Sequence, residues 1–176
     1  TPLFFAKDQE LIGIIGVADV VKPTSRQAIE ELRNMGIETV MLTGDNTKTA
    51  TAIQKQVGVD RIVAEVLPQD KEREVRQLQG SGKKVAMVGD GINDTPALSM
   101  ADVSISLQDS SDIARELADI TLVSNSLNDI VALRMISEGL FKRIHSQYRL
   151  IVGLNTSFIV LGALGLLTPQ MLAMLH

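Results

Sequence analysis

Two aspartates four residues apart, Asp90 and Asp94, stand in a glycine-containing turn directly after a short apolar run. The run over 84–88 predicts a buried parallel strand, and Gly89 and Gly91 let the backbone turn sharply behind it. Open α/β sheets bind ligands at the carboxyl ends of their strands, beside the first amide groups of the following helices. Two carboxylates on one turn repel unless a cation lies between them. The turn therefore predicts a magnesium and phosphate site.

A second strand-to-helix turn has related chemistry. The apolar run over 37–42 ends at Thr43, Gly44 and Asp45, and a helix is expected over 47–57. A hydroxyl, a glycine amide and the positive end of a helix form a cradle for phosphate oxygens. A plain capping turn would explain the acid alone. It would not explain why such a group recurs beside another turn that bears aspartate.

A lone Gly-Asp-Gly would by default be a capped turn, but the run over 89–98 is longer and more specific. It resembles the signature of P-type cation-transporting ATPases, whose phosphorylation domain is of the haloacid dehalogenase type. Residues 19–23, Asp-Val-Val-Lys-Pro, resemble the hinge motif of the same ATPases, although Pro23 is also a common helix start. The resemblance covers essentially the whole chain and is strongest to the heavy-metal-translocating (type IB) branch.

The resemblance implies roles for the residues of both turns. Asp90 and Asp94 would bind magnesium, and Asn93 would belong to the same catalytic turn. Thr43 and Gly44 would hold the phosphoryl group during its transfer.

Three further charged residues receive roles from the resemblance. Lys71 matches a Pro-x-x-Lys lysine, which would neutralise charge on the transferring phosphoryl oxygens. Its acidic and basic neighbours alone would instead suggest a solvated helix lysine. Asp45 is expected to help catalysis by positioning the nucleotide or the site, and Asp19 and Asp45 are the expected contacts of ATP.

Strands alternate with helices along the chain, which predicts an α/β fold with a Rossmann-like, haloacid dehalogenase-type parallel sheet. The sheet is expected to be incomplete, because the family's Asp-Lys-Thr-Gly-Thr, which bears the phosphorylated aspartate, does not occur in this sequence. The chain is thus interpreted as the carboxyl-terminal part of a longer protein. Residues 1–18 would end the nucleotide-binding domain and form the hinge region, and residues 19–126 would belong to the phosphorylation domain. Alone, the chain is expected neither to hydrolyse ATP nor to form a phosphoenzyme.

Residues 127–176 are expected to hold a linker helix, one transmembrane helix and the start of a second. The transmembrane prediction rests on residues 150–167, eighteen positions without a charge, with a buried core helix as the alternative. Basic residues before this run place its beginning, and the catalytic domain, in the cytosol. Asn155 within the run is a candidate contact of the transported metal, although a hydrogen bond between helices would explain it equally well.

Composition excludes some partners. Aromatic residues make up 3% of the chain and the net charge is −4, so the sequence offers neither stacking platforms nor a basic footprint for nucleic acid. The chain has no cysteine, which excludes disulfides and thiol ligands within it.

The sequence therefore predicts part of an ATP-driven heavy-metal transporter that works through an aspartyl phosphate. Mg²⁺ and ATP are the expected cofactors. The expected partners are the transported metal cation, the lipid bilayer and the remaining domains of the same chain. The full protein would lie in a membrane. Two alternatives stay open: a soluble haloacid dehalogenase-type phosphatase, and a non-catalytic module that binds phosphate or magnesium. The identity of the metal also stays open.

Overall fold

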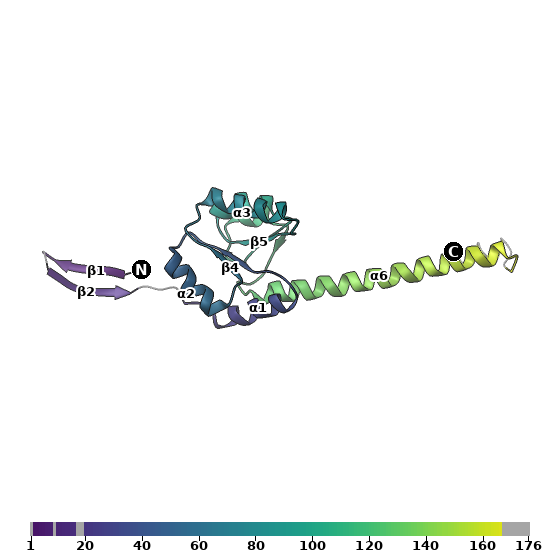
Figure 1. The fold of residues 1–176 in the computed structure, drawn as a ribbon, viewed down its shortest axis with the longest axis horizontal. Coiled ribbons are helices and arrows are strands. Elements are labelled where there is room, and N and C mark those ends of the chain that lie inside the picture. Colours follow the sequence, from purple (N-terminus) through teal and green to yellow (C-terminus); the bar gives the residue numbers. More distant parts are fainter. Residues whose placement is uncertain (1, 9, 17–19, 167–176) are drawn as a thin grey trace. The chain divides into compact units, whose positions relative to one another are not determined.

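A computed structural model describes residues 2–8, 10–16 and 20–166 of the chain (Figure 1). The chain divides into two compact units, Thr1–Val131 and Ala132–His176. The boundaries expected at residues 18 and 126 separate domains by their function in the full protein, so they stay predictions.

The chain begins with an antiparallel hairpin of β1 (Pro2–Lys7) and β2 (Glu10–Gly16). Successive side chains of a strand point to opposite faces. Because apolar residues occupy consecutive positions in both strands, both faces of this hairpin are apolar, and Phe4 and Ile12 are more than half exposed. The assignment of this hairpin to the nucleotide-binding domain stays a prediction.

The first parallel pair of strands consists of β3 (Val40–Leu42) and β4 (Arg61–Val63), with α2 (Thr47–Val57) between them in sequence. Helix α1 (Pro23–Asn34) precedes the pair, and the chain leaves it through Gly36 at φ 78°. A positive φ of this kind favours glycine. The strands are shorter than the apolar runs that predicted them.

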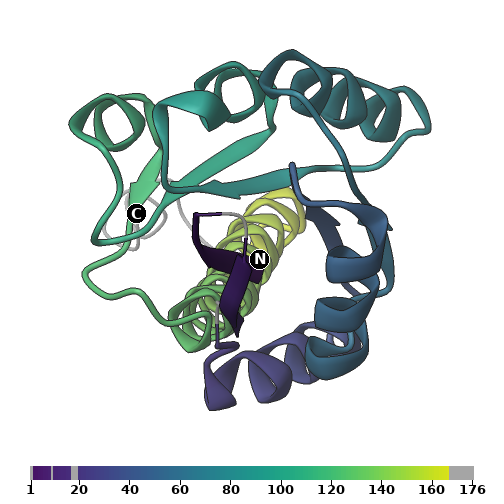
Figure 2. The same ribbon diagram turned by 90° about the vertical axis from the view of Figure 1, so that its left-hand side faces the viewer.

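The second sheet has the strand order β5-β6-β7, and all its strands are parallel. Its strands and the helices around it are α3 (Pro68–Gly80), β5 (Ala86–Gly89), the 3₁₀ turn η1 (Ile92–Asp94), α4 (Thr95–Met100), β6 (Val103–Ser106), α5 (Asp112–Leu117) and β7 (Ile120–Thr121). Helix α3 packs against α4, and α4 packs against β5 (Figure 2). The predicted alternation of parallel strands and helices is confirmed, but the strands form two separate sheets among the described residues.

Three aspartates clamp the amino ends of these parallel strands. Each stands directly before a strand and accepts a hydrogen bond from a backbone N–H at the start of the neighbouring strand. The pairs are Asp60 with Thr39 (2.8 Å), Asp102 with Val85 (3.0 Å) and Asp119 with Ser104 (2.8 Å). We call them the amino-edge aspartates.

Hydrogen bonding to the charged form lowers the pKa of all three carboxyls. The main cause is the Thr39 N–H for the pKa of Asp60 and the Ser104 N–H for that of Asp119. The Lys84 ammonium, followed by the Val85 N–H, lowers the pKa of Asp102 to about 2. These carboxylates are therefore ionised structural groups at the edge opposite to the predicted site.

Helix α1 supplies much of the apolar core of the first unit. It buries one face, which carries Ala28, Ile29 and Leu32. Two buried clusters result: Ala28 and Leu32 with Val131, and Ile29 with Val57 and Val59. The predicted hinge lysine, Lys22, also fastens the start of this helix, because its ammonium donates to the carbonyl of Asn125 at 2.8 Å.

The last described element, α6 (Asn128–Ala163), corrects the prediction of a transmembrane helix. The predicted linker helix runs on without a break into the apolar stretch over 150–167, but the helix ends at Ala163. About 20 apolar residues are needed to cross a bilayer. The helical part of the stretch is shorter than this and contains Asn155. No helix among the described residues is long and apolar enough to span a membrane. The predicted start of a second transmembrane helix lies outside the described residues.

Candidate phosphate and magnesium site

The Gly89–Asp94 turn is closely packed around the second of its two aspartates. Strand β5 ends at Gly89, and a Cβ at this position would lie only 2.8 Å from the Cβ of Asp94. Any side chain at position 89 would therefore displace Asp94. Glycine is required here by this close approach, which explains why the strand must end in glycine before the chain turns into η1.

Asp94 forms a largely buried ion pair with Lys71. The Lys71 Nζ lies 2.6 Å from the Asp94 Oδ1, and their side chains are 17% and 11% exposed. The lysine stands in the first turns of α3, and the aspartate stands directly before α4, the helix against which α3 packs. The packing of these two helices thus positions a charge-assisted hydrogen bond at the carboxyl end of β5.

Asp90 and Asn93 are open to solvent beside this pair. The carboxylate of Asp90 makes no hydrogen bond or ion pair with any residue that the structure describes, whereas that of Asp94 is occupied on one oxygen. The turn therefore presents one unpartnered carboxylate next to one that is already neutralised.

Two serines that sequence reasoning missed hold this turn from the other side. The Ser110 hydroxyl donates to the carbonyl of Gly89 at 3.2 Å, and the Ser111 N–H donates to the carbonyl of Asp90 at 2.9 Å. Ser111 also caps α5. A serine before a helix is a recognisable cap signal, but nothing in the sequence shows that the same loop fixes the backbone of Asp90.

The Thr43–Asp45 turn is held by its own hydrogen bonds. The Thr43 hydroxyl donates to the Asp45 Oδ2 at 2.9 Å and accepts from the Asp45 N–H at 3.1 Å. Gly44 is less constrained than Gly89, since a Cβ there would meet only the carbonyl of Val66, at 3.6 Å. The turn is an exposed, preformed loop in which the helix cap is Asn46.

A backbone bond links this turn to the helix that bears Lys71. The Val66 N–H donates to the carbonyl of Thr43 at 3.0 Å, and α3 begins two residues later at Pro68. No side-chain hydrogen bond or ion pair among the described residues joins the Thr43 group directly to the Lys71–Asp94 pair. The Thr43–Asp45 turn is therefore linked to α3 through the backbone, whereas its side chains do not contact those of the Lys71–Asp94 pair.

Two predicted site residues remain, Asp19 and Asn155. Asp19 lies outside the described residues. Asn155 is on α6 in the second unit, about a third of the way along the stretch that was expected to cross the membrane.

The carboxylates of the Gly89–Asp94 turn suit a magnesium ion that keeps several water ligands, rather than one bound by protein ligands alone. No group of three or more histidine, cysteine, aspartate or glutamate side chains that could hold a metal is found in the part of the chain that the structure describes. Magnesium keeps several waters and binds through one or two carboxylates together with phosphate oxygens. The open carboxylate of Asp90, with the second oxygen of Asp94, meets that smaller requirement.

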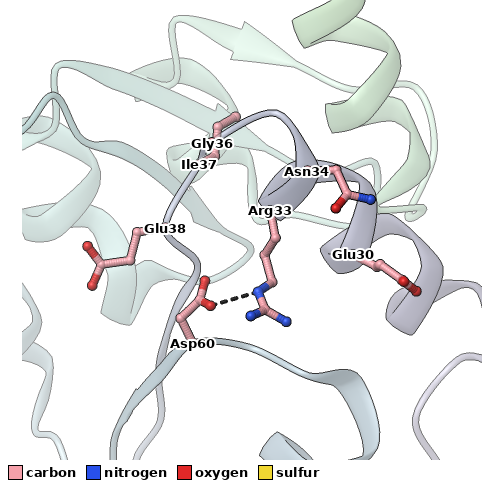
Figure 3. Close-up of a pocket in the computed structure, with 7 residues that line it drawn as sticks. All are labelled: Glu30, Arg33, Asn34, Gly36, Ile37, Glu38 and Asp60. Atoms are coloured by element: carbon pink, nitrogen blue, oxygen red, sulfur yellow. Dashed lines mark ion pairs between the residues drawn. The ribbon is translucent and has the colours of Figure 1, made fainter.

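A separate hollow lies at the opposite end of the strands and contains none of the predicted site residues (Figure 3). In it, the Arg33 Nε lies 2.7 Å from the Oδ1 of Asp60, and Glu38 lies nearby and pairs with Lys83. Because Asp60 also accepts from both the N–H and the hydroxyl of Thr39, this hollow is part of the strand clamp.

Comparison with known families identifies the fold. A profile described as haloacid dehalogenase-like hydrolase matches residues 2–102, and a second profile of the same description matches residues 72–133. The chain belongs to the haloacid dehalogenase-like hydrolase family. The matches include β3, β5 and both predicted turns, so the predicted fold type is confirmed.

Relatives of this chain include metal-transporting ATPases. The chain is 45% identical, over 169 residues, to the probable copper-exporting P-type ATPase V of Mycobacterium tuberculosis, an alignment that covers 96% of this chain and 22% of the relative. It is 46% identical to a copper-exporting P-type ATPase of Staphylococcus epidermidis, with 96% and 21% covered. A crystal structure of a zinc-transporting PIB-type ATPase in its E2.Pi state matches with a TM-score of 0.88 and 32% identity, covering 96% of this chain and 28% of that one.

These relatives confirm the resemblance to heavy-metal P-type ATPases that the motifs indicated. The chain spans about a fifth of the length of the two curated relatives.

Proposed function

We propose that this chain is part of an ATP-driven heavy-metal transporter, in which it supplies the magnesium- and phosphate-binding half of the phosphorylation site. The observation that carries the proposal is the buried Lys71–Asp94 ion pair beside the open carboxylate of Asp90. A lysine and two aspartates at the carboxyl end of a parallel strand suit phosphoryl transfer, which depends on positioning and on charge stabilisation. The copper- and zinc-transporting relatives support the class of cargo.

The proposal gives each turn a separate task. Asp90 binds magnesium, which when bound neutralises charge on the phosphoryl group. Lys71 fixes the carboxylate of Asp94 and keeps a positive charge beside the transferring oxygens, and Asn93 offers an exposed amide to the same site. Thr43 and Gly44 hold phosphoryl oxygens through hydroxyl and amide hydrogens.

The Asp45 carboxylate supports this cradle by accepting from the Thr43 hydroxyl. That bond directs the hydroxyl hydrogen toward Asp45. A phosphoryl oxygen must therefore attract the hydrogen away, or accept instead from the amides of the turn. Asp45 and Asp19 remain the proposed contacts of ATP.

The two sheets support an origin of the nucleophile in the remaining domains of the same chain. Among the described residues, β3 and β5 each form an open edge of their sheet. Both are followed by a predicted phosphate turn. A parallel strand between them would join the sheets and bring its own carboxyl end to the same edge. We infer that the phosphorylated aspartate follows such a strand, and that the 176-residue chain alone forms no phosphoenzyme.

The transport role is the broader part of the proposal. The full protein would lie in a membrane, with this catalytic unit in the cytosol. Its hydrolysis of ATP would drive the transport of a heavy-metal cation. Asn155 is retained as a candidate contact of that cation. The names of the relatives favour copper or zinc.

The test is the formation of phosphoenzyme from radiolabelled ATP in the full-length protein. Asp90→Asn should abolish magnesium-dependent labelling while ATP binding is retained, because it removes one ligand charge without altering the nucleotide pocket. Asp112→Asn is the matched control, since it neutralises another exposed aspartate of the same unit, and it should label normally. Normal labelling of Asp90→Asn would refute the proposed role of Asp90. Magnesium-dependent release of phosphate from small phosphate esters, without any labelled enzyme, would instead support a soluble phosphatase.

A further inference from the structure

The carboxylate of Asp90 has no side-chain partner to hold it in place. It makes no hydrogen bond or ion pair with a described residue, and it stands between Gly89 and Gly91. Glycine lets the backbone adopt many conformations, so fixing the backbone in one of them costs conformational entropy. The position of this carboxylate therefore depends on whatever fixes the peptide groups on either side of Asp90.

Both of those peptide groups are bound by the loop over 107–111, which we call the serine loop. The hydroxyl of Ser110 donates to the carbonyl of Gly89 at 3.2 Å, and it accepts from the Leu107 N–H at 2.8 Å. The Ser111 N–H donates to the carbonyl of Asp90 at 2.9 Å. Ser110 is only 6% exposed, so its hydroxyl depends on these two partners rather than on water. Ser110 thus fixes the turn and the serine loop at the same time.

The serine loop is itself anchored by Asn125. The Asn125 Oδ1 accepts from the Asp109 N–H at 3.0 Å, and the Asn125 Nδ2 donates to the Asp109 carboxylate. Beside this pair, the Gln108 N–H donates to the carbonyl of Ser124 at 3.3 Å. The carbonyl of Asn125 accepts in turn from the ammonium of Lys22 at 2.8 Å. An unbroken series of hydrogen bonds therefore connects the start of α1 with the Asp90 turn.

A magnesium ion is sensitive to how its few protein ligands are held. Magnesium demands nearly ideal octahedral geometry and binds through one or two carboxylates. A ligand that is already held in place loses little freedom when the cation arrives. Partners that orient a metal ligand without touching the metal typically change its affinity by about 10- to 100-fold. The serine loop should therefore act on the affinity for magnesium.

We propose that Ser110 and Asn125 are positioning residues, which fix the backbone of Asp90 through the serine loop and thereby set the affinity of the turn for magnesium. The inference rests on the proposed function, in which Asp90 binds this ion. It adds two residues that touch neither the ion nor the phosphoryl group. Neither residue carries a charge, so they act by holding the ligand and not by attracting the cation.

The test is the rise in the thermal midpoint of the full-length protein as magnesium is added without ATP. Because a bound ligand stabilises only the folded state, the concentration dependence of this rise reports the affinity. Ser110→Ala should require about 10-fold more magnesium for the same rise. Ser110→Thr retains the hydroxyl and should recover most of the affinity. Asn125→Ala should act in the same direction but less strongly, since the Ser110 hydroxyl remains.

The same titration separates positioning from a purely structural role. A structural loss alone would lower the midpoint without magnesium and leave the concentration dependence unchanged. Gln108→Ala is the matched control, because this exposed side chain of the serine loop makes no hydrogen bond among the described residues, and it should behave like the unaltered protein. At saturating magnesium, Ser110→Ala should also form phosphoenzyme at the unaltered level, since its catalytic groups are intact.

The outcomes also separate this inference from the proposed function. Asp90→Asn should remove the magnesium-dependent rise, and its persistence would refute the role of Asp90 and the inference with it. Loss of the rise in Asp90→Asn, together with an unchanged magnesium dependence in Ser110→Ala, would overturn the inference alone. An equal shift in Gln108→Ala would overturn it as well. If Ser110→Ala did not fold, Asn125→Ala would decide in its place, because it leaves the buried serine intact.

Discussion

The two ends of the parallel strands use aspartate for opposite purposes. At the amino ends, the amino-edge aspartates Asp60, Asp102 and Asp119 accept hydrogen bonds from the backbone of a neighbouring strand. At the carboxyl end of β5, Asp90 is exposed and unpartnered among the described residues. The same side chain is therefore part of the scaffold at one edge and available for a ligand at the other.

Hydrogen-bonding partners therefore distinguish structural from functional carboxylates better than residue type does. A carboxylate that accepts backbone N–H groups is already stabilised in its charged form. An unpartnered carboxylate can exchange water for a cation at little structural cost. Asp94 is the intermediate case, because it lies at the carboxyl edge but is paired with Lys71.

The largest expected effect on stability comes from breaking the Lys71–Asp94 ion pair. Asp94→Ala should lower the free energy of unfolding by about 3 kcal/mol, because it leaves the Lys71 ammonium largely buried without its partner. The midpoint of urea unfolding, followed by circular dichroism, measures the loss.

A double variant provides the control for this prediction. Lys71→Met combined with Asp94→Leu removes both charges and should recover most of the lost stability, since no unpaired charge remains. If Asp94→Ala alone left the urea midpoint unchanged, the pair would not contribute to stability, and Asp94 would belong with Asp90 as a purely functional carboxylate.

The next prediction compares the stability cost of removing one aspartate from each edge, Asp60 and Asp90. Asp60→Ala should cost about 2 kcal/mol of unfolding free energy, because the buried Thr39 loses an acceptor for both its N–H and its hydroxyl. Asp90→Ala should change stability by no more than about 0.5 kcal/mol, since its carboxylate has no described partner to lose. Equal thermal shifts in the two variants would erase the distinction between the edges.

Much of the fold follows from local sequence patterns. The predicted helix over 47–57 coincides with α2, because its apolar period and its cap signal agree there. The predicted transmembrane helix is not supported among the described residues. An uncharged run shows only that a helix could enter lipid, while the end of the helix at Ala163 depends on the backbone conformation that follows.

The site was predictable as a list of residues but not as a set of contacts. The motifs identified Lys71, Asp90 and Asp94, yet the ion pair between the lysine and Asp94 joins positions 23 apart and depends on how α3 packs against α4. The amino-edge aspartates were missed, although Ala-Asp occurs directly before both β6 and β7. That repetition signals a clamp only when the neighbouring strand is known.

The smallest expected effect is the acid dependence of stability at the amino edge. The Lys84 ammonium and then the Val85 N–H hold the pKa of Asp102 at about 2, below its ordinary value of 3.8. The folded chain therefore binds fewer protons than the unfolded chain between these values, and its stability falls as the pH falls. The contribution of Asp102 is fully present above about pH 4 and is lost toward pH 2.

Replacement of this carboxyl separates its contribution from those of the other two clamps. Asp102→Asn should make the loss of stability between pH 4 and pH 2 shallower, as measured by thermal melting across that range. Lys84→Met should have a smaller effect in the same direction, because the hydrogen bonds from Val85 and Gln79 remain. An unchanged slope in Asp102→Asn would mean that the unfolded chain binds this proton no more readily than the folded one. The clamp at the start of β6 would then be held by the backbone alone, and the contrast between the two edges would rest on Asp60 and Asp119.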